Sequence, residues 1–93
     1  MERQRFANVW DAIEDTPAEA AIMTVRSNLM MAVDRRVRSW GTTRAESAQR
    51  LGITQPQLVD LLRGRIANFD TDTLLTLATQ AGLTVRLDIA EAA

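Results

Sequence analysis

The feature that most constrains the fold is a pair of helix start signals in the middle of the chain. In TRAE, which begins at Thr43, and in TQPQ, which begins at Thr54, a threonine stands three residues before a glutamate or a glutamine. Each is a capping box, because the hydroxyl and the longer side chain together satisfy backbone N–H groups that the first helical turn leaves free. Gly52 stands where a left-handed backbone conformation can end a helix. The spacing predicts two short helices joined as a helix-turn-helix, one over residues 43–51 and one that begins at residue 54 and ends at residue 62 or 63.

Hydrophobic periodicity divides this motif into two faces. Ala48 is small at the position where the two helices would cross. The side chains expected to point into the core are Ile53, Leu58, Leu61 and Leu62. The opposite face of the second helix carries Gln55, Pro56, Val59, Asp60 and Arg63. An ordinary helical hairpin has a similar spacing, so the spacing alone leaves both interpretations open.

A long helix is predicted before the motif. In TPAE, residues 16–19, the threonine caps the helix, the proline takes the first helical position and the glutamate completes a capping box. Gly41 can end this helix, and the sequence leaves open whether it bends near Ser27 and Asn28. The apolar stripe that would face the core consists of Ile22, Val25, Leu29, Val33, Val37 and Trp40. Three methionines lie partly off the stripe and suit core filling or a dimer contact: Met23, Met30 and Met31.

Shorter elements are predicted towards the two ends of the chain. Residues 1–15 hold an amphipathic segment with apolar residues at helical spacing, namely Phe6, Val9, Trp10 and Ile13. A further helix begins after Asp70, ends at Gly82 and would bury Leu74, Leu75, Leu77, Ala78 and Ala81. Residues 84–89 alternate like a strand, with Val85, Leu87 and Ile89 on one face and Arg86 and Asp88 on the other. No second strand is predicted, so the expected partner is the same strand of another copy.

These elements predict one domain, residues 1–93, of a mainly all-α class. We expect a bundle of about five helices with one C-terminal β-strand that pairs across a dimer. A chain of this length can build one modest core but not two independent ones.

Charge is distributed unevenly, although the net charge is only −1. Residues 1–34 carry three arginines and six acidic residues, residues 35–65 carry seven and two, and residues 66–93 carry one and four. The three segments therefore have net charges of −3, +5 and −3. A basic middle between acidic ends is typical of a local phosphate-binding surface, and also of a solvated arginine face.

Several reactive residue types are missing from the sequence, which has no cysteine, no histidine and no lysine. Thiol chemistry, the commonest general base and metal ligand, and lysine nucleophiles are therefore excluded. We expect no enzyme, no catalytic residue, no metal site and no cofactor. No apolar run approaches the roughly 20 residues that a membrane span needs, and no signal-peptide core is visible, so a cytoplasmic protein is expected.

Residues 43–64, TRAESAQRLGITQPQLVDLLRG, resemble the XRE-type helix-turn-helix regulators. The resemblance implies a lambda-repressor-like fold and sequence-specific binding to double-stranded operator DNA. More narrowly, the stretches FANVWDAIEDTPAEA, LLRGRIANF and LTVRLDI resemble antitoxins of HigBA- and RelBE-like toxin–antitoxin modules. Arg44 stands where the family usually has glutamine, and Leu58 and Val59 stand where a Val-Ser pair is common.

The DNA contacts of such a motif divide into those that position the duplex and those that read it. We expect Arg44, Arg63 and Arg65 to contact phosphates, helped by the backbone N–H groups that follow Thr54. Gln55, in the first turn of the second helix, is expected to pair with the N6 and N7 edge of an adenine.

Three further residues of the same helix are expected at the DNA. Gln57 is less available because the capping box engages it. Val59 offers only an apolar contact, such as one with a thymine methyl group. Asp60 has two open interpretations: an acceptor for a cytosine amino group, or a partner that orients Arg63 or Arg44.

The sequence therefore predicts a dimeric DNA-binding repressor. By resemblance it is an antitoxin that neutralises a small basic ribonuclease toxin, encoded by a neighbouring gene, and represses its own operon. The candidate toxin contact is the acidic segment with Phe6, Val9, Trp10 and Ile13, for which docking onto the core is the alternative. A stand-alone transcriptional regulator without a toxin, and a protein-interaction module that does not bind DNA, are the other two interpretations.

Overall fold

A computed structural model of the chain describes residues 16–92. Its longest element is helix α2, Pro17–Trp40, with 24 residues. The Thr16 hydroxyl accepts a hydrogen bond from the Glu19 backbone N–H at 3.0 Å, and Gly41 ends the helix with a φ of 66°. The helix is continuous through residues 27–28, so it does not break at the position that the sequence left open.

The two central capping boxes form as predicted. They start α3, Arg44–Leu51, and α4, Gln55–Leu62. Gly52 ends α3 with a φ of 74°, and the Ile53 backbone N–H donates to the Ala48 carbonyl at 3.0 Å. The predicted helix-turn-helix is confirmed.

A short 3-10 helix, η1 (Ile66–Asn68), leads to the last helix, α5 (Thr71–Gln80). Asp70 caps α5, because its carboxylate accepts from the Thr73 backbone N–H at 2.8 Å. Hydrogen bonding to Thr73 lowers the pKa of the Asp70 carboxyl. The charged form of this acid is therefore part of the helix cap.

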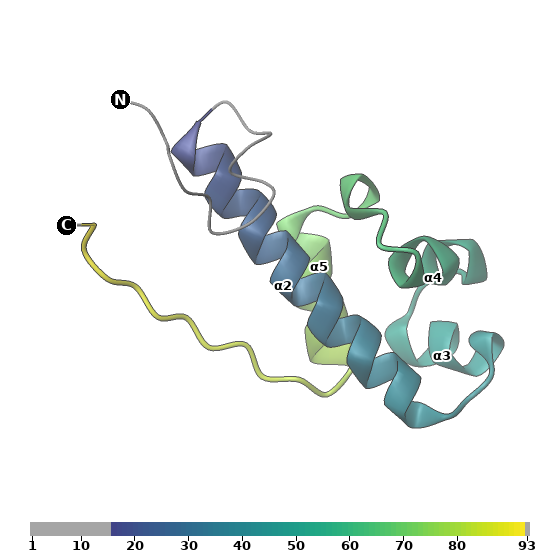
Figure 1. Ribbon diagram of the computed structural model, residues 1–93. Coiled ribbons are helices and arrows are strands. Elements are labelled where there is room, and N and C mark those ends of the chain that lie inside the picture. The colour runs from purple at the N-terminus through teal and green to yellow at the C-terminus, as the bar shows by residue number, and fades with distance from the viewer. Residues whose placement is uncertain (1–15, 93) are drawn as a thin grey trace.

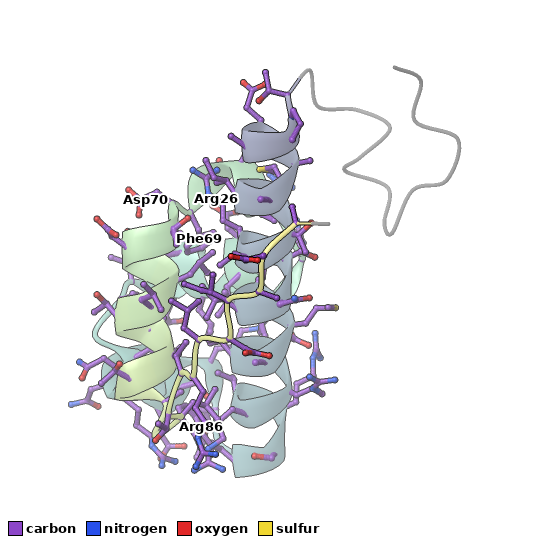
Figure 2. The ribbon with its side chains drawn as sticks, turned by 90° about the vertical axis from the view of Figure 1, so that its left-hand side faces the viewer. Arg26, Phe69, Asp70 and Arg86 are labelled. Carbon is purple, nitrogen blue, oxygen red and sulfur yellow. The ribbon has the colours of Figure 1, made fainter. Side chains whose placement is uncertain are left out.

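Helix α5 packs along α2 and is fixed to it at both ends. At the start of α5, Arg26 Nε donates to the Thr71 hydroxyl at 3.4 Å, and beyond its end Arg36 Nε donates to the Ala81 carbonyl at 3.0 Å. Figure 2 shows Arg26 and Asp70 near one end of this helix pair and Arg86 near the other. The C-terminal segment therefore leaves the pair at the end opposite to Arg26.

The core lies where α2, α3, α4 and α5 meet, and its most deeply buried side chains are Val33, Leu51, Leu58, Leu61, Leu74 and Leu77. Of the predicted α2 stripe, Leu29, Val33 and Val37 are buried, whereas Ile22 and Val25 are 45% and 44% exposed. The reason is that α5 begins opposite Arg26, so the first turns of α2 extend beyond the bundle (Figure 1).

Two other burial predictions had mixed outcomes. Met30 is buried in the core, whereas Met31 is 50% exposed, because neighbouring helical residues point in different directions. Leu75 was expected on the buried side of α5 but is 37% exposed, so that prediction is wrong. Leu74, Leu77, Ala78 and Ala81 form the buried side without it.

The C-terminal residues follow Gly82, which has a φ of 84°. Within residues 16–92 no strand is present, so the predicted strand over residues 84–89 is not formed by this chain on its own. Val85 is 45% exposed, and Leu87 and Ile89 are 82% and 80% exposed. Figure 1 shows this segment on one side of α2, with α3 and α4 on the other.

The described residues contain four α-helices and one 3-10 helix, so the fold is mainly helical as expected. None of these helices is long and apolar enough to span a membrane. The segment with Phe6, Val9, Trp10 and Ile13, which supplied the fifth predicted helix, lies outside the described residues.

Candidate nucleic-acid interface

The first turn of α4 is held by the two reciprocal hydrogen bonds of its capping box. The Gln57 backbone N–H donates to the Thr54 hydroxyl at 3.2 Å, and the Thr54 backbone N–H donates to Gln57 Oε1 at 2.8 Å. The amide oxygen of Gln57 is therefore engaged by the cap, which agrees with the lower availability inferred from the sequence. Gln55 is exposed and free of such a cap contact, so its amide is open to solvent.

Helix α3 is supported by a second set of polar contacts. Glu46 accepts from the Thr43 backbone N–H at 3.0 Å and from the Thr43 hydroxyl at 3.1 Å. These hydrogen bonds lower the pKa of the Glu46 carboxyl, the backbone bond being the larger cause. Ser47, only 3% exposed, shares a 2.7 Å hydrogen bond with Thr42. The position of α3 relative to the end of α2 is therefore fixed by paired groups rather than by apolar packing alone.

The two faces of α4 are arranged as the periodicity predicted. Leu58 and Leu61 are 0% and 1% exposed and belong to the core. The opposite face is formed by the exposed residues Gln55, Pro56 and Gln57 and by the half-buried residues Val59 and Asp60, with Arg63 exposed just beyond the helix. Pro56 is an exposed apolar residue of this face and Val59 is half-buried, whereas the other members are polar, so the face suits a mainly polar partner.

Two arginines with free guanidinium groups lie at the edges of the motif. Arg44 is the first residue of α3, and Arg63 follows the last residue of α4. Both are exposed, and no residue within 16–92 forms a hydrogen bond or an ion pair with either side chain. A free guanidinium is a strong donor to phosphate oxygens, because its N–H groups match them in geometry and charge.

A third arginine near this face was missed by the sequence analysis. Arg38 Nε donates to both carboxylate oxygens of Asp34, at 3.0 and 3.1 Å, and its Nη2 donates to the Leu62 carbonyl at 3.4 Å. It lines, with Arg44, a cavity of about 130 Å³ between α2, α3 and α4. The spacing of Asp34 and Arg38, four residues apart on a helix, was a signal for the ion pair, but nothing in the sequence placed it beside α4.

Asp60 has partners other than the two arginines considered from the sequence. Its Oδ2 accepts from Asn68 Nδ2 at 3.1 Å, and its Oδ1 lies 3.8 Å from Arg65 Nε. Neither Arg63 nor Arg44 is its partner. Asn68 had no role in the sequence analysis, because a contact with a loop eight residues away leaves no periodic signal.

One further arginine contact lies at the junction of α2 and α3. The Arg50 guanidinium carbon is 3.9 Å from the centroid of the Trp40 ring, which is a cation–π contact. Arg50 is thereby associated with an aromatic ring and is not a simple solvated helix residue. This leaves Arg44 and Arg63 as the arginines of the motif that have no partner within the described chain.

The described residues hold no group of three or more acidic side chains that would suit a metal ion, and the sequence has no cysteine or histidine.

The profile of the helix-turn-helix domain family matches residues 12–90, which is most of the chain. No curated protein shows significant similarity to it.

Proposed function

The chain belongs to the helix-turn-helix domain family, and on that premise we propose that it is a dimeric repressor of transcription that binds palindromic operator DNA. Membership supports a DNA-binding regulator of XRE type. We propose in addition that the chain forms a dimer, that it represses transcription and that the residues named below contact DNA.

The observation that carries the proposal is the exposed face of α4 with a free arginine on either side of the motif. Arg44 and Arg63 supply two positive charges that no described residue neutralises. The segment of net charge +5, residues 35–65, contains the whole motif, so a chain with a net charge of −1 still presents a basic surface to a duplex. In this assignment Arg44, Arg63 and Arg65 contact phosphates, and Gln55 reads a base.

Dimerisation is supported by the position and exposure of the C-terminal segment. It lies on the side of α2 away from α3 and α4 (Figure 1), and it crosses the α2 and α5 pair in the view of Figure 2. Two copies joined through residues 84–89 would therefore keep both helix-turn-helix motifs on the outside. A two-fold dimer of this kind reads half-sites about 34–36 Å apart, or a multiple of that distance.

We also propose that the chain acts as an antitoxin. This role is supported by the resemblance of the sequence to antitoxins and by the exposed apolar residues Ile22 and Val25, which lie in the first part of α2, the element that follows the acidic N-terminal segment along the chain. Phe6, Val9, Trp10 and Ile13 remain the proposed toxin contacts, and the proposed partner is a small basic ribonuclease. A stand-alone regulator is the alternative, and co-expression with the product of the neighbouring gene distinguishes the two.

The test of DNA binding is fluorescence anisotropy with duplexes selected from random sequences by the wild-type chain. Arg44→Ala and Arg63→Ala should each weaken binding to all sequences alike, and each should lower the salt dependence by about one unit of slope. Arg35→Ala is the matched control, because Arg35 is exposed on α2 and has no partner in the described chain. Absence of any binding by the wild-type chain at low salt would contradict the proposal. A change in base preference with an unchanged salt slope would contradict the phosphate role of the two arginines.

A further inference from the structure

Asp60 is an acidic residue on the face of α4 that is proposed to meet DNA. Its side chain is only 33% exposed, and each carboxylate oxygen has a partner from the loop after the helix. Asn68 donates to Oδ2 at 3.1 Å, and Arg65 Nε lies 3.8 Å from Oδ1. An unpaired carboxylate here would repel the phosphates of a duplex, whereas the pair with Arg65 has no net charge.

The backbone of the loop brings both partners to the carboxylate. The Arg65 backbone N–H donates to the Asp60 carbonyl at 3.0 Å, and the Asn68 backbone N–H donates to the Arg65 carbonyl at 3.0 Å. Gly64, with a φ of 72°, allows the chain to turn back directly after α4. Residues 65–68 therefore lie beside Asp60 for reasons that do not depend on the side-chain contacts.

Both partners keep hydrogen-bonding capacity for a ligand. The ion pair of Arg65 with Asp60 runs through Nε, and no residue within 16–92 hydrogen-bonds its guanidinium, so its two NH₂ groups are free for a phosphate. Asn68 gives one amide hydrogen to Asp60 and retains the other, together with its carbonyl oxygen.

We propose that Asp60 is a positioning residue that holds Arg65 and Asn68 for contact with the DNA backbone, and that Asn68 is a further DNA-contacting residue. The inference rests on the proposed DNA-binding function. Asp60 contributes by restricting the rotamers of a long and a short side chain before DNA binds, which lowers the entropy lost on binding. It does not read a base in this assignment.

A double-mutant cycle on the full chain tests the proposal, with affinity measured for selected and random duplexes at several salt concentrations. Arg65→Ala should weaken binding by about tenfold in the wild-type background, the effect of one charge-assisted contact. In the Asp60→Ala background the same change should cost less than about twofold, because Arg65 is no longer held in place. Asn68→Ala should weaken binding to all sequences alike, and only while Asp60 is present.

Two further variants separate positioning from folding. Asp34→Ala removes a carboxylate from another arginine ion pair of similar exposure, and with Arg65→Ala it should be additive. Asp60→Asn keeps an acceptor for Asn68 but loses the charge that attracts Arg65, so it should uncouple Arg65 alone. Thermal melting establishes that each variant is folded.

The outcomes distinguish this inference from the proposed function. Equal losses from Arg65→Ala in both backgrounds would overturn the positioning role while DNA binding stands. A changed preference at one base pair in Asp60→Ala, with additive effects, would assign Asp60 to base reading instead. A wild-type chain that binds no DNA would remove the proposed function itself.

Discussion

The two sides of α2 are built in opposite ways. On the side of α3 and α4 the apolar side chains are inside, as Leu58 and Leu61 show, and the helix starts are capped by paired groups. On the side of the C-terminal segment they are outside, with Leu87 and Ile89 at least 80% exposed. The first side is complete within one chain, whereas the second exposes apolar surface that water disfavours. In the proposed dimer, the first side is completed by folding and the second by association.

The largest expected effect comes from replacing one leucine on each side of α2 with alanine and comparing the losses of stability. Leu58→Ala should lower the free energy of unfolding by about 2–5 kcal/mol, because the side chain is 0% exposed and a cavity remains. Leu87→Ala should lower it by less than about 0.5 kcal/mol at concentrations where the protein is monomeric, because the side chain is 82% exposed. Urea denaturation measures both. Similar losses at the two sites would mean that the C-terminal segment packs on its own chain.

A second prediction concerns association through the exposed side. Leu87→Asp should yield a monomer with reduced operator affinity, because a charge placed in an apolar interface costs about 2 kcal/mol or more. Analytical ultracentrifugation gives the oligomeric state, and Leu75→Asp, on the exposed part of α5, is the control that should leave it unchanged. A dimer that survives Leu87→Asp would place the interface elsewhere, for example along α2.

The register of the proposed strand pair can be tested by exchanging charges. With a two-fold axis at Leu87, Val85 faces Ile89 and Arg86 faces Asp88 twice, whereas an axis at Arg86 or Asp88 would oppose like charges. Arg86→Asp should weaken the dimer, and Asp88→Arg in the same chain should restore it, each opposite-charge pair contributing about 0.2–1 kcal/mol. Failure of the second change to restore association would exclude this register.

A fourth prediction returns to the side of α3 and α4 and asks whether α4 reads DNA sequence. Gln55→Ala should remove preference at one base pair in each half-site, a loss of about 1–3 kcal/mol in discrimination, while non-specific binding persists. Sequence selection with the variant and the wild type measures the difference. Gln49→Ala, an exposed glutamine on α3, is the matched control. Unchanged preference in Gln55→Ala would transfer base reading to another residue of α4.

The same contrast explains what the sequence predicted and what it did not. The helix-turn-helix was predictable because Thr43, Gly52 and Thr54 act on residues within a few positions of themselves. The exposure of Ile22 and Val25 was not, because it depends on where α5 begins in space. Contacts between distant residues, such as Asn68 with Asp60, also escaped, since no periodicity connects a helix to the loop beside it.

The proposed DNA-contacting residues differ in how far the sequence alone predicts their surroundings. The exposed position of Gln55 and the free guanidinium groups of Arg44 and Arg63 follow from helix periodicity and from the ends of α3 and α4. Arg65 is different, since its ion pair with Asp60 depends on the turn at Gly64. Helix periodicity therefore predicts which side chains are exposed, but not which of them pair with residues of a neighbouring loop.

The smallest expected effect concerns the two capping boxes of the motif. Glu46 and Gln57 complete them in the same way, but only Glu46 titrates. The pKa of Glu46 lies below its ordinary value of 4.5, so its contribution to stability is present above pH 4.5 and is lost as the pH falls through the folded-state pKa. Glu46→Gln should keep the cap, as Gln57 does in α4, and should weaken the acid dependence of the melting temperature between pH 7 and pH 3. Gln57→Glu should do the reverse and add a second acid-sensitive cap. An unchanged pH profile in both variants would mean that these caps hold the helices by geometry alone, with no contribution from the charge of Glu46.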